Sequence, residues 1–246
     1  MRASKYTKQY VVKSHEVDCH GFLRLLCLMN IMQDIALENA DALGVGLDAC
    51  RQHNLSWVGS NYLLQIVRFP KLQEKFTIET WPDDSKLCSA IRNFVIFDEM
   101  QNPIIKATSQ WVLIDLERRR PVAIEKYFSG YETLHEQVIA ADFMKPLTPP
   151  ENCSAYEYRV RFDDIDVNKH VNNAVYALWA SESIDESYRF EHLPQEIEIC
   201  FKKETFYGET VAVKTQMKNH ESHHFITDKS TGIELAQCRI KWQKTA

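Results

Sequence analysis

Residues 156–180 read YEYRVRFDDIDVNKHVNNAVYALWA, a strand-like pattern followed by a helix-like one. Its first seven residues alternate between large apolar and charged side chains, a period of two that predicts a half-buried strand over 156–162. Farther on, apolar residues occur on every side of a predicted helix over 172–188, so we expect that helix to be enclosed. Asn172 and Asn173 are both of the residue type that caps a helix N-terminus.

The first half of the chain repeats this plan. Residues 6–17 predict a strand, residues 24–43 have apolar side chains at helical spacing, and Gly44 is a suitable stop. Strand-like runs follow each helix, at 62–69, 75–81, 90–97 and 109–116 in the first half and at 196–203, 209–217, 222–228 and 233–242 in the second.

The two halves also align residue by residue. A shift of 148 residues places Tyr10 over Tyr158 and Asp18 over Asp166, and a shorter shift places EKFTI (74–78) over ETVAV (209–213). The repeat predicts an α+β protein of two similar domains, each an antiparallel sheet wrapped around one long central helix. We place the domains at 1–140 and 150–246, with a proline-containing linker at 141–149.

Composition limits the function. The chain has 246 residues, 45% hydrophobic and 26% charged, as expected of globular domains, and its net charge of −5 argues against a nucleic-acid partner. Its seven cysteines form no CxxC pair, so we interpret them as reduced, buried thiols. No apolar run reaches the ~20 residues of a membrane span, and the N-terminus lacks a signal peptide, so we expect a cytoplasmic protein.

The histidines outside the 164–173 segment, His135 among them, show no ligand spacing with a cysteine or an acidic residue. We therefore expect no metal and no cofactor. His223 and His224 fall in a predicted strand, and we interpret them as a solvated edge.

Asp166, Asn168 and His170 stand on alternate residues immediately before the second predicted helix. An extended segment would place them on one side, beside the helix N-terminus, where unpaired N–H groups stabilise an oxyanion. His170 can move protons near neutral pH, and Asp166 can hold it or the Asn168 amide. A turn plus a helix cap is the alternative interpretation. The first half has Asp18, His20 and Phe22 at these positions, so only one half has the polar set.

The segment DIDVNKHVNNAVYALWASES (164–183) resembles the active-site segment of the acyl-acyl-carrier-protein (acyl-ACP) thioesterases, the plant FatA/FatB-type enzymes and their bacterial relatives. The likeness continues in NIMQDIALENA (30–40), LSWV (55–58), VRFP (67–70), ETW (79–81), SQWVLIDLERRRP (109–121) and FKKET (201–205). This resemblance implies a tandem (double) hot-dog fold and hydrolysis of fatty acyl-ACP to free fatty acid and carrier. It assigns catalysis to Asp166, Asn168, His170 and Glu204.

Many plant members have a cysteine after the catalytic glutamate, where this chain has Thr205, which favours direct attack by water with Glu204 or His170 as the base. Strict strand alternation would point Glu204 away from the face of Ile197 and Ile199; a bulge or an earlier strand end would remove this conflict. Glu182 is a rival base, but it lies about 15 Å along the helix from the N-terminus.

The resemblance implies an acyl chain bound in the first domain and an acidic carrier protein as partner. Leu25, Leu28, Met29 and Met32 are the candidate acyl-chain residues, with core packing as the alternative role. The candidate carrier-docking residues are Arg118, Arg119, Arg120, Lys202 and Lys203. Two other functions stay open, an acyl-CoA thioesterase and a non-catalytic acyl-binding protein, as does the choice between a single chain and a homodimer.

Overall fold

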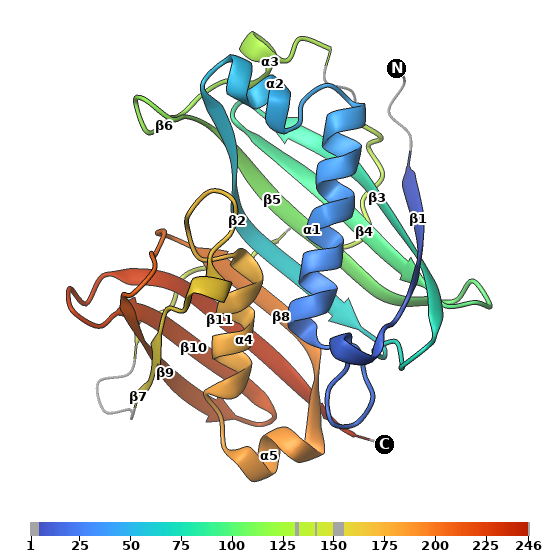
Figure 1. The fold of residues 1–246 in the computed structure, drawn as a ribbon, viewed down its shortest axis with the longest axis vertical. Coiled ribbons are helices and arrows are strands. Elements are labelled where there is room, and N and C mark those ends of the chain that lie inside the picture. Colours follow the sequence, from blue (N-terminus) through green and yellow to red (C-terminus); the bar gives the residue numbers. More distant parts are fainter. Residues whose placement is uncertain (1–4, 131–132, 141, 150–154, 246) are drawn as a thin grey trace. The chain divides into compact units, whose positions relative to one another are not determined.

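The computed structural model describes residues 5–130, 133–140, 142–149 and 155–245. The chain divides into two compact units, Met1–Asp142 and Phe143–Ala246. Each unit contains one antiparallel sheet with a helix across one of its faces (Figure 1). The linker start predicted at 141 and the domain start predicted at 150 lie outside the described residues.

In the first unit, helix α1 (Leu25–Ala42) packs on a sheet in the order β1-β3-β4-β5-β2. Its strands are β1 (Tyr6–Val11), β2 (Leu55–Ile66), β3 (Lys75–Lys86), β4 (Ser89–Phe97) and β5 (Pro103–Asp115), and the short β6 (Arg120–Pro121) pairs with β5. The smaller helices are η1 (Ser14–Glu16), α2 (Leu47–Gln52) and α3 (Ile124–Tyr127).

In the second unit, helix α4 (Asn173–Glu182) packs on a sheet in the order β7-β9-β10-β11-β8. The strands are β7 (Ala155–Arg159), β8 (His192–Phe201), β9 (Thr210–Lys218), β10 (Glu221–Asp228) and β11 (Glu234–Lys244). The remaining helices are η2 (Phe162–Asp164) and α5 (Glu186–Glu191). Strand for strand, this is the order of the first unit.

The duplication extends to the strand register. Tyr10 pairs with Phe76 across β1 and β3, and Tyr158 pairs with Val211 across β7 and β9. These are the pairs related by the two shifts read from the sequence, 148 residues on one strand and 135 on the other.

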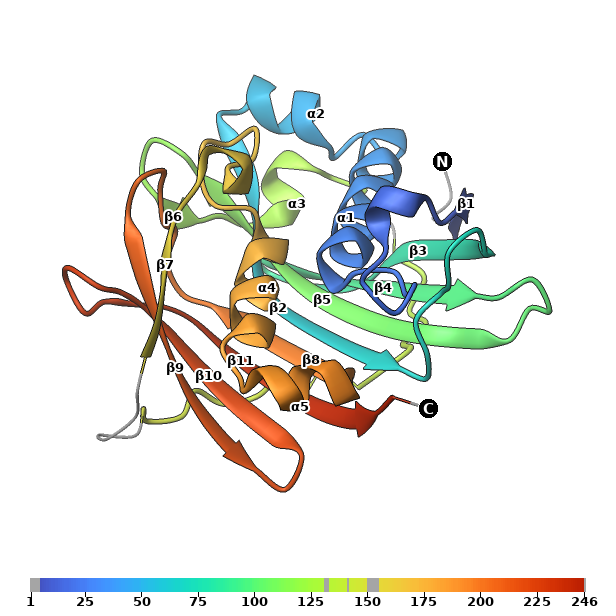
Figure 2. The same cartoon turned by 60° about the horizontal axis from the view of Figure 1, so that its bottom comes forward.

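Each sheet buries the face that meets its helix. In the first unit, Ile78, Ile96 and Ile105 stand opposite one another on β3, β4 and β5 and are almost inaccessible. Leu28, Met32 and Ile35 of helix α1 are equally buried, and Figure 2 shows this helix lying over the sheet. Burial of this apolar area drives the association of helix and sheet.

The predicted helix over 172–188 is wrong in extent, because α4 ends at Glu182 and a separate helix follows. Polar side chains cause the break. The Ser183 hydroxyl donates to the Ala180 carbonyl, and the Asp185 carboxylate accepts the N–H of Tyr188 as the cap of α5. Serine and aspartate at such positions offer the backbone alternatives to a continuous helix.

Several predicted strands also differ from the structure in extent: β7 ends at Arg159 rather than 162, and β5 begins at Pro103 rather than 109. The strand predicted over 6–17 ends at Val11, and η1 follows it. Strand β2 covers Leu55–Ile66 rather than 62–69, since its polar centre hides the period-two pattern where the register shifts between Gly59 and Asn61. A bulge of this kind interrupts alternation without ending the strand.

The side-chain expectations need two corrections. Cys19 is exposed and Cys27, Cys88 and Cys200 are half-buried, although all six cysteines of the described chain are free thiols. The 223–224 pair is no solvated edge, because β10 lies inside the sheet and the His224 side chain is fully buried.

None of the helices in the described ranges is both long and apolar enough to cross a membrane.

Hydroxyl groups surround the His224 imidazole on both ring nitrogens. Nδ1 lies 3.0 Å from the Ser183 hydroxyl and 2.9 Å from the Thr215 hydroxyl, and Nε2 lies 2.7 Å from the Ser222 hydroxyl. Burial, with a smaller contribution from the nearby His223, lowers the pKa of His224 from 6.5 to about 3. The folded protein therefore holds this imidazole neutral at neutral pH.

We expect this buried histidine to make folding sensitive to mild acid. Below pH 6.5 the unfolded chain protonates this imidazole, whereas the folded chain does so only near pH 3, so stability present at neutral pH is lost as the pH falls through that window. Because of this residue, the free energy of unfolding measured with urea should be lower at pH 4 than at pH 7 by on the order of 3 kcal/mol. A His224→Asn variant with the same pH dependence as wild type would contradict this account.

Candidate active site

The loop between η2 and α4 presents the predicted catalytic residues. An isolated bridge joins Ile165 to Val171, and within it the N–H of Asp166 donates to the carbonyl of His170 at 2.9 Å. The Asp166 carboxylate accepts the backbone N–H of Asn168 at 2.8 Å and its side-chain amide at 3.2 Å. Asp166 therefore shapes the loop and orients the Asn168 amide, as an aspartate does in a tight turn.

Helix α4 begins directly after this loop. The Asn172 side chain caps it by accepting the N–H of Ala174 at 2.9 Å, and the backbone N–H of Asn172 donates to the carbonyl of Asp164. The positive end of the helix dipole thus lies beside the loop, which favours a negative charge at this place.

Glu204 reaches the same place from the end of β8. The strand ends at Phe201, and the N–H groups of both Lys202 and Lys203 donate to the single carbonyl of Leu235. Two residues opposing one on the neighbouring strand is the geometry of a bulge. The early strand end and this bulge remove the conflict that strict alternation raised for Glu204.

A backbone hydrogen bond brings the two segments together. The N–H of Val171 donates to the carbonyl of Thr205 at 3.0 Å, so the residues next to His170 and Glu204 are fixed to each other. The His170 Nε2 atom lies 3.5 Å from a Glu204 carboxylate oxygen. The two side chains are 32% and 27% exposed, so water and a substrate carbonyl can reach them.

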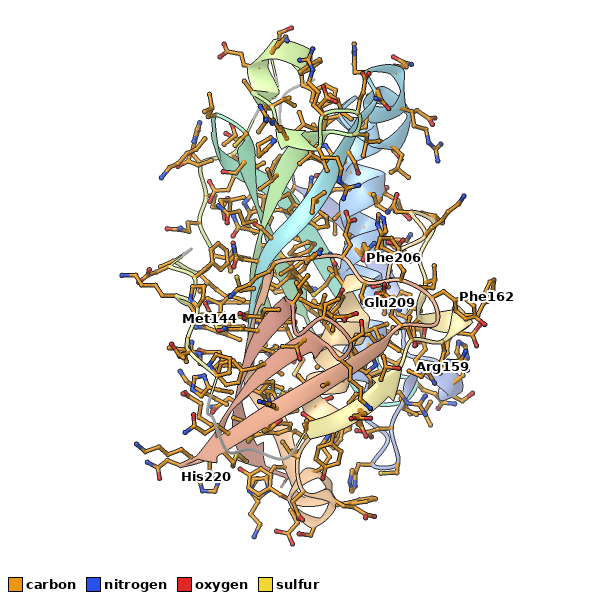
Figure 3. All side chains as sticks on the ribbon, turned by 90° about the vertical axis from the view of Figure 1, so that its left-hand side faces the viewer. Met144, Arg159, Phe162, Phe206, Glu209 and His220 are labelled. Atoms are coloured by element: carbon orange, nitrogen blue, oxygen red, sulfur yellow. The ribbon has the colours of Figure 1, made fainter. Side chains whose placement is uncertain are left out.

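Thr205 itself faces the protein interior. Its side chain is fully buried, and its hydroxyl donates to the Glu209 carboxylate at 2.5 Å, which also accepts the N–H of Phe206 at 2.9 Å. Glu209 and Phe206 are on the same side of the second unit in Figure 3. A buried hydroxyl committed to a carboxylate is not placed to attack a substrate, so Thr205 has a structural role in the turn after Glu204.

The first unit repeats the backbone of this site without its chemistry. The N–H of Leu23 donates to the carbonyl of Pro70 at 2.8 Å, the counterpart of the bond from Val171 to Thr205. The residues before these two are Phe22 and Phe69, at the positions that correspond to His170 and Glu204. Neither phenylalanine can transfer a proton, so at these two positions only the second unit has a candidate acid–base pair.

Of the other predicted residues, Lys202 and Lys203 directly precede Glu204, and the rest lie on other elements. Leu25, Leu28, Met29 and Met32 are buried on α1 in the first unit. Arg118, Arg119 and Arg120 are exposed at the β5–β6 turn of that unit. In the second unit, Lys203 is exposed and Lys202 pairs with Glu234 at 2.8 Å. The rival base Glu182 is the last residue of α4, half exposed and 3.9 Å from Arg189.

The expectation that His135 has no acidic partner is wrong. His135 hydrogen-bonds Asp84, and together with Asp83 the three offer ligand atoms within 4.8 Å of one another. Asp84 and His135 are exposed. No sequence spacing indicated the contact, because it joins strand β3 to a segment some fifty residues later.

Sequence reasoning missed two features of the site. Glu209 had no assigned role, and its bond to Thr205 is visible only in the folded turn. Phe69 was detectable, because the 135-residue shift that aligns the strands also places Phe69 over Glu204.

Comparisons with known proteins identify the family. A match to the family described as "Acyl-ACP thioesterase N-terminal domain" covers residues 3–130, and one to "Acyl-ACP thioesterase C-terminal domain" covers residues 147–244. The chloroplastic oleoyl-acyl carrier protein thioesterase of Coriandrum sativum is 22% identical to the chain over 97% of its length and 77% of the relative.

Two solved structures share the fold over nearly their whole length. An oleoyl thioesterase from Lactobacillus plantarum aligns with a TM-score of 0.89 at 25% identity, covering 99% of this chain and 98% of that one. The 12:0-ACP thioesterase from Umbellularia californica aligns with a TM-score of 0.87 at 21% identity, covering 98% of each chain. With both family domains matched in order, the chain belongs to the acyl-ACP thioesterase family.

Proposed function

We propose that this chain hydrolyses the thioester of a fatty acyl-ACP and releases the free fatty acid and the carrier thiol. The observation that carries the proposal is the His170–Glu204 pair, 3.5 Å apart and partly exposed, beside the N-terminus of α4. The family descriptions and the names of the Coriandrum sativum and Umbellularia californica relatives refer to acyl carrier protein thioesterases, which supports the choice of substrate.

The reaction needs a nucleophile and a place for negative charge. Water, deprotonated by Glu204 or His170, adds to the thioester carbonyl carbon, and the carbonyl oxygen becomes an oxyanion. The first turn of α4 stabilises this oxyanion. The carbon–sulfur bond then breaks, and the proton taken from water passes to the departing thiolate, which restores the base. Throughout the reaction, the Asp166 carboxylate holds the Asn168 amide in place.

Each unit is interpreted as one hot-dog domain, so that the chain is a tandem hot-dog of α+β class. The first domain binds the acyl chain, with Leu25, Leu28, Met29 and Met32 as wall residues in addition to their packing role. Methionine suits such a wall because its side chain adapts to the ligand shape. Carrier docking at Arg118, Arg119, Arg120, Lys202 and Lys203, a cytoplasmic location and the possibility of a homodimer stay predictions.

Substrate hydrolysis can be measured directly. Incubation with carrier-bound acyl thioesters of graded chain length, followed by identification of the released acids, should show turnover with a preferred length. The same acyl groups on CoA should be cleaved less efficiently. Equal efficiency on CoA would favour the acyl-CoA thioesterase alternative, and ligand binding without turnover would favour the non-catalytic one.

Glu204 and Glu182 provide a matched pair of variants for the base. Glu204→Gln removes the carboxylate beside His170 and should lower kcat by at least about 100-fold, the scale of a lost acid–base group. Glu182→Gln makes the same chemical change at the far end of α4 and should leave kcat within a few-fold of wild type. The opposite ranking, with both variants folded, would transfer the catalytic role to Glu182.

A Thr205→Val variant tests the water mechanism against a covalent one. Valine keeps the shape of threonine, and Glu209 retains the N–H of Phe206, so the loss of one hydrogen bond to a carboxylate should cost about 2 kcal/mol of stability. We expect kcat to stay within about tenfold of wild type, since no nucleophile is removed. Complete loss of turnover in the folded variant, with recovery in Thr205→Ser, would contradict direct attack by water.

A further inference from the structure

Four large apolar side chains are exposed around the His170–Glu204 pair. They are Phe162 (77% exposed), Val167 (83%), Phe206 (44%) and Tyr207 (61%), and we call them the aromatic rim. They come from η2, from the loop before α4 and from the turn after Glu204. Exposed apolar groups gathered on one surface are typical of an interaction site.

The rim is continuous with the candidate active site. The rings of Phe162 and Tyr207 meet edge to face with centroids 6.2 Å apart, and Phe206 meets the His170 imidazole in the same way at 5.2 Å. Figure 3 shows Phe162 and Phe206 on one side of the second unit, with Met144 on the opposite side. The rim therefore adjoins the candidate active site through the contact of Phe206 with His170.

The fold does not require these apolar residues. The first unit builds the same loop and turn with matching backbone hydrogen bonds, and its counterparts of the rim are Ser14, Cys19, Lys71 and Leu72. All three aromatic rings are thus absent from the copy that also lacks the acid–base pair. The rim and the catalytic residues occur together, in one copy only.

Lys169 adds a cation at an unfavourable backbone position. Its φ angle is +66°, in the left-handed region, where the first unit has Gly21 with φ +80°. Glycine adopts this conformation without strain, whereas lysine does not. The second unit therefore carries a cation, in place of glycine, on the loop between Val167 and His170.

Lys169 and Lys203 are both exposed, and neither forms an ion pair within the described ranges. Asp163 on η2 is an exposed acidic residue nearby, while the Arg161 guanidinium is already paired with Asp164 at 2.7 Å. Lys169 and Lys203 therefore lie on the loops that also carry Val167 and Phe206.

We propose that the aromatic rim, with Lys169 and Lys203, is the docking surface for the acidic carrier protein. Apolar residues of the carrier surface pack on Phe162, Val167 and Tyr207, and its acidic side chains pair with the two lysines. The thioester arm then enters past Phe206 toward His170. This inference rests on the proposed function, since it identifies the surface through which that substrate is delivered.

The kinetic test compares one acyl group on two carriers, the intact carrier protein and free pantetheine. Tyr207→Ala and Lys169→Gly should each lower the ratio of the two kcat/KM values, carrier over pantetheine, by at least tenfold. Lys169→Gly places the residue of the first unit at its counterpart and relieves strain, so a folding defect cannot explain its effect. The matched control is Leu72→Ala, the first-unit counterpart of Tyr207, which should leave the ratio within twofold.

A binding test separates this inference from the proposed activity. Titration of labelled, unacylated carrier protein onto wild type and the same variants measures docking without turnover. At least tenfold weaker binding in Tyr207→Ala and Lys169→Gly supports the docking surface, whether or not the chain hydrolyses thioesters. Unchanged binding in both variants overturns it, as does a Tyr207→Ala variant that loses only self-association, which would make the rim a contact between copies of this chain.

Discussion

The hydrogen bond from the N–H of Val171 to the carbonyl of Thr205 is the contact on which the candidate site depends. It joins the loop that opens α4 to the turn that ends β8, two segments some thirty-four residues apart in sequence. Neither segment is regular structure at this point, so without the bond their side chains would have no fixed separation. Because backbone groups make it, substitution of the neighbouring side chains can change the chemistry while the geometry persists.

The two halves of the chain show this separation of backbone from chemistry. The first unit preserves the bond between Leu23 and Pro70, yet has Phe22 and Phe69 where the second has His170 and Glu204. The first unit therefore has two phenylalanine side chains in place of the titratable pair, and its buried Phe69 adds to the packing. The other copy keeps two titratable groups partly exposed and retains a lysine in a strained conformation beside them.

The sequence predicted the element order and the strand register well, because the duplication provides an internal alignment. Prediction from the sequence failed where polar side chains interrupt the period of the apolar residues. Ser183 and Asp185 divide the second predicted helix, and the polar centre of β2 concealed the first half of that strand. His224 illustrates the same limit. The sequence alone suggests a solvated histidine pair, because two of the hydroxyl groups around His224, those of Ser183 and Thr215, come from other segments of the chain.

The site residues divide in the same way. Asp166, Asn168 and His170 were detectable because their spacing is local, and Glu204 came from resemblance alone, since alternation argued against it. The bulge at Lys202 and Lys203 that reorients Glu204 depends on a carbonyl of β11, which no local pattern reveals.

In the proposed reaction, His170 and Glu204 act as a pair on one attacking water. A double-mutant cycle on kcat, with His170→Ala, Glu204→Gln and the double variant, tests it most directly. If the pair acts as a unit, the double variant will be scarcely slower than the slower single variant. If the two losses in rate simply multiply, the residues act independently and the account is wrong.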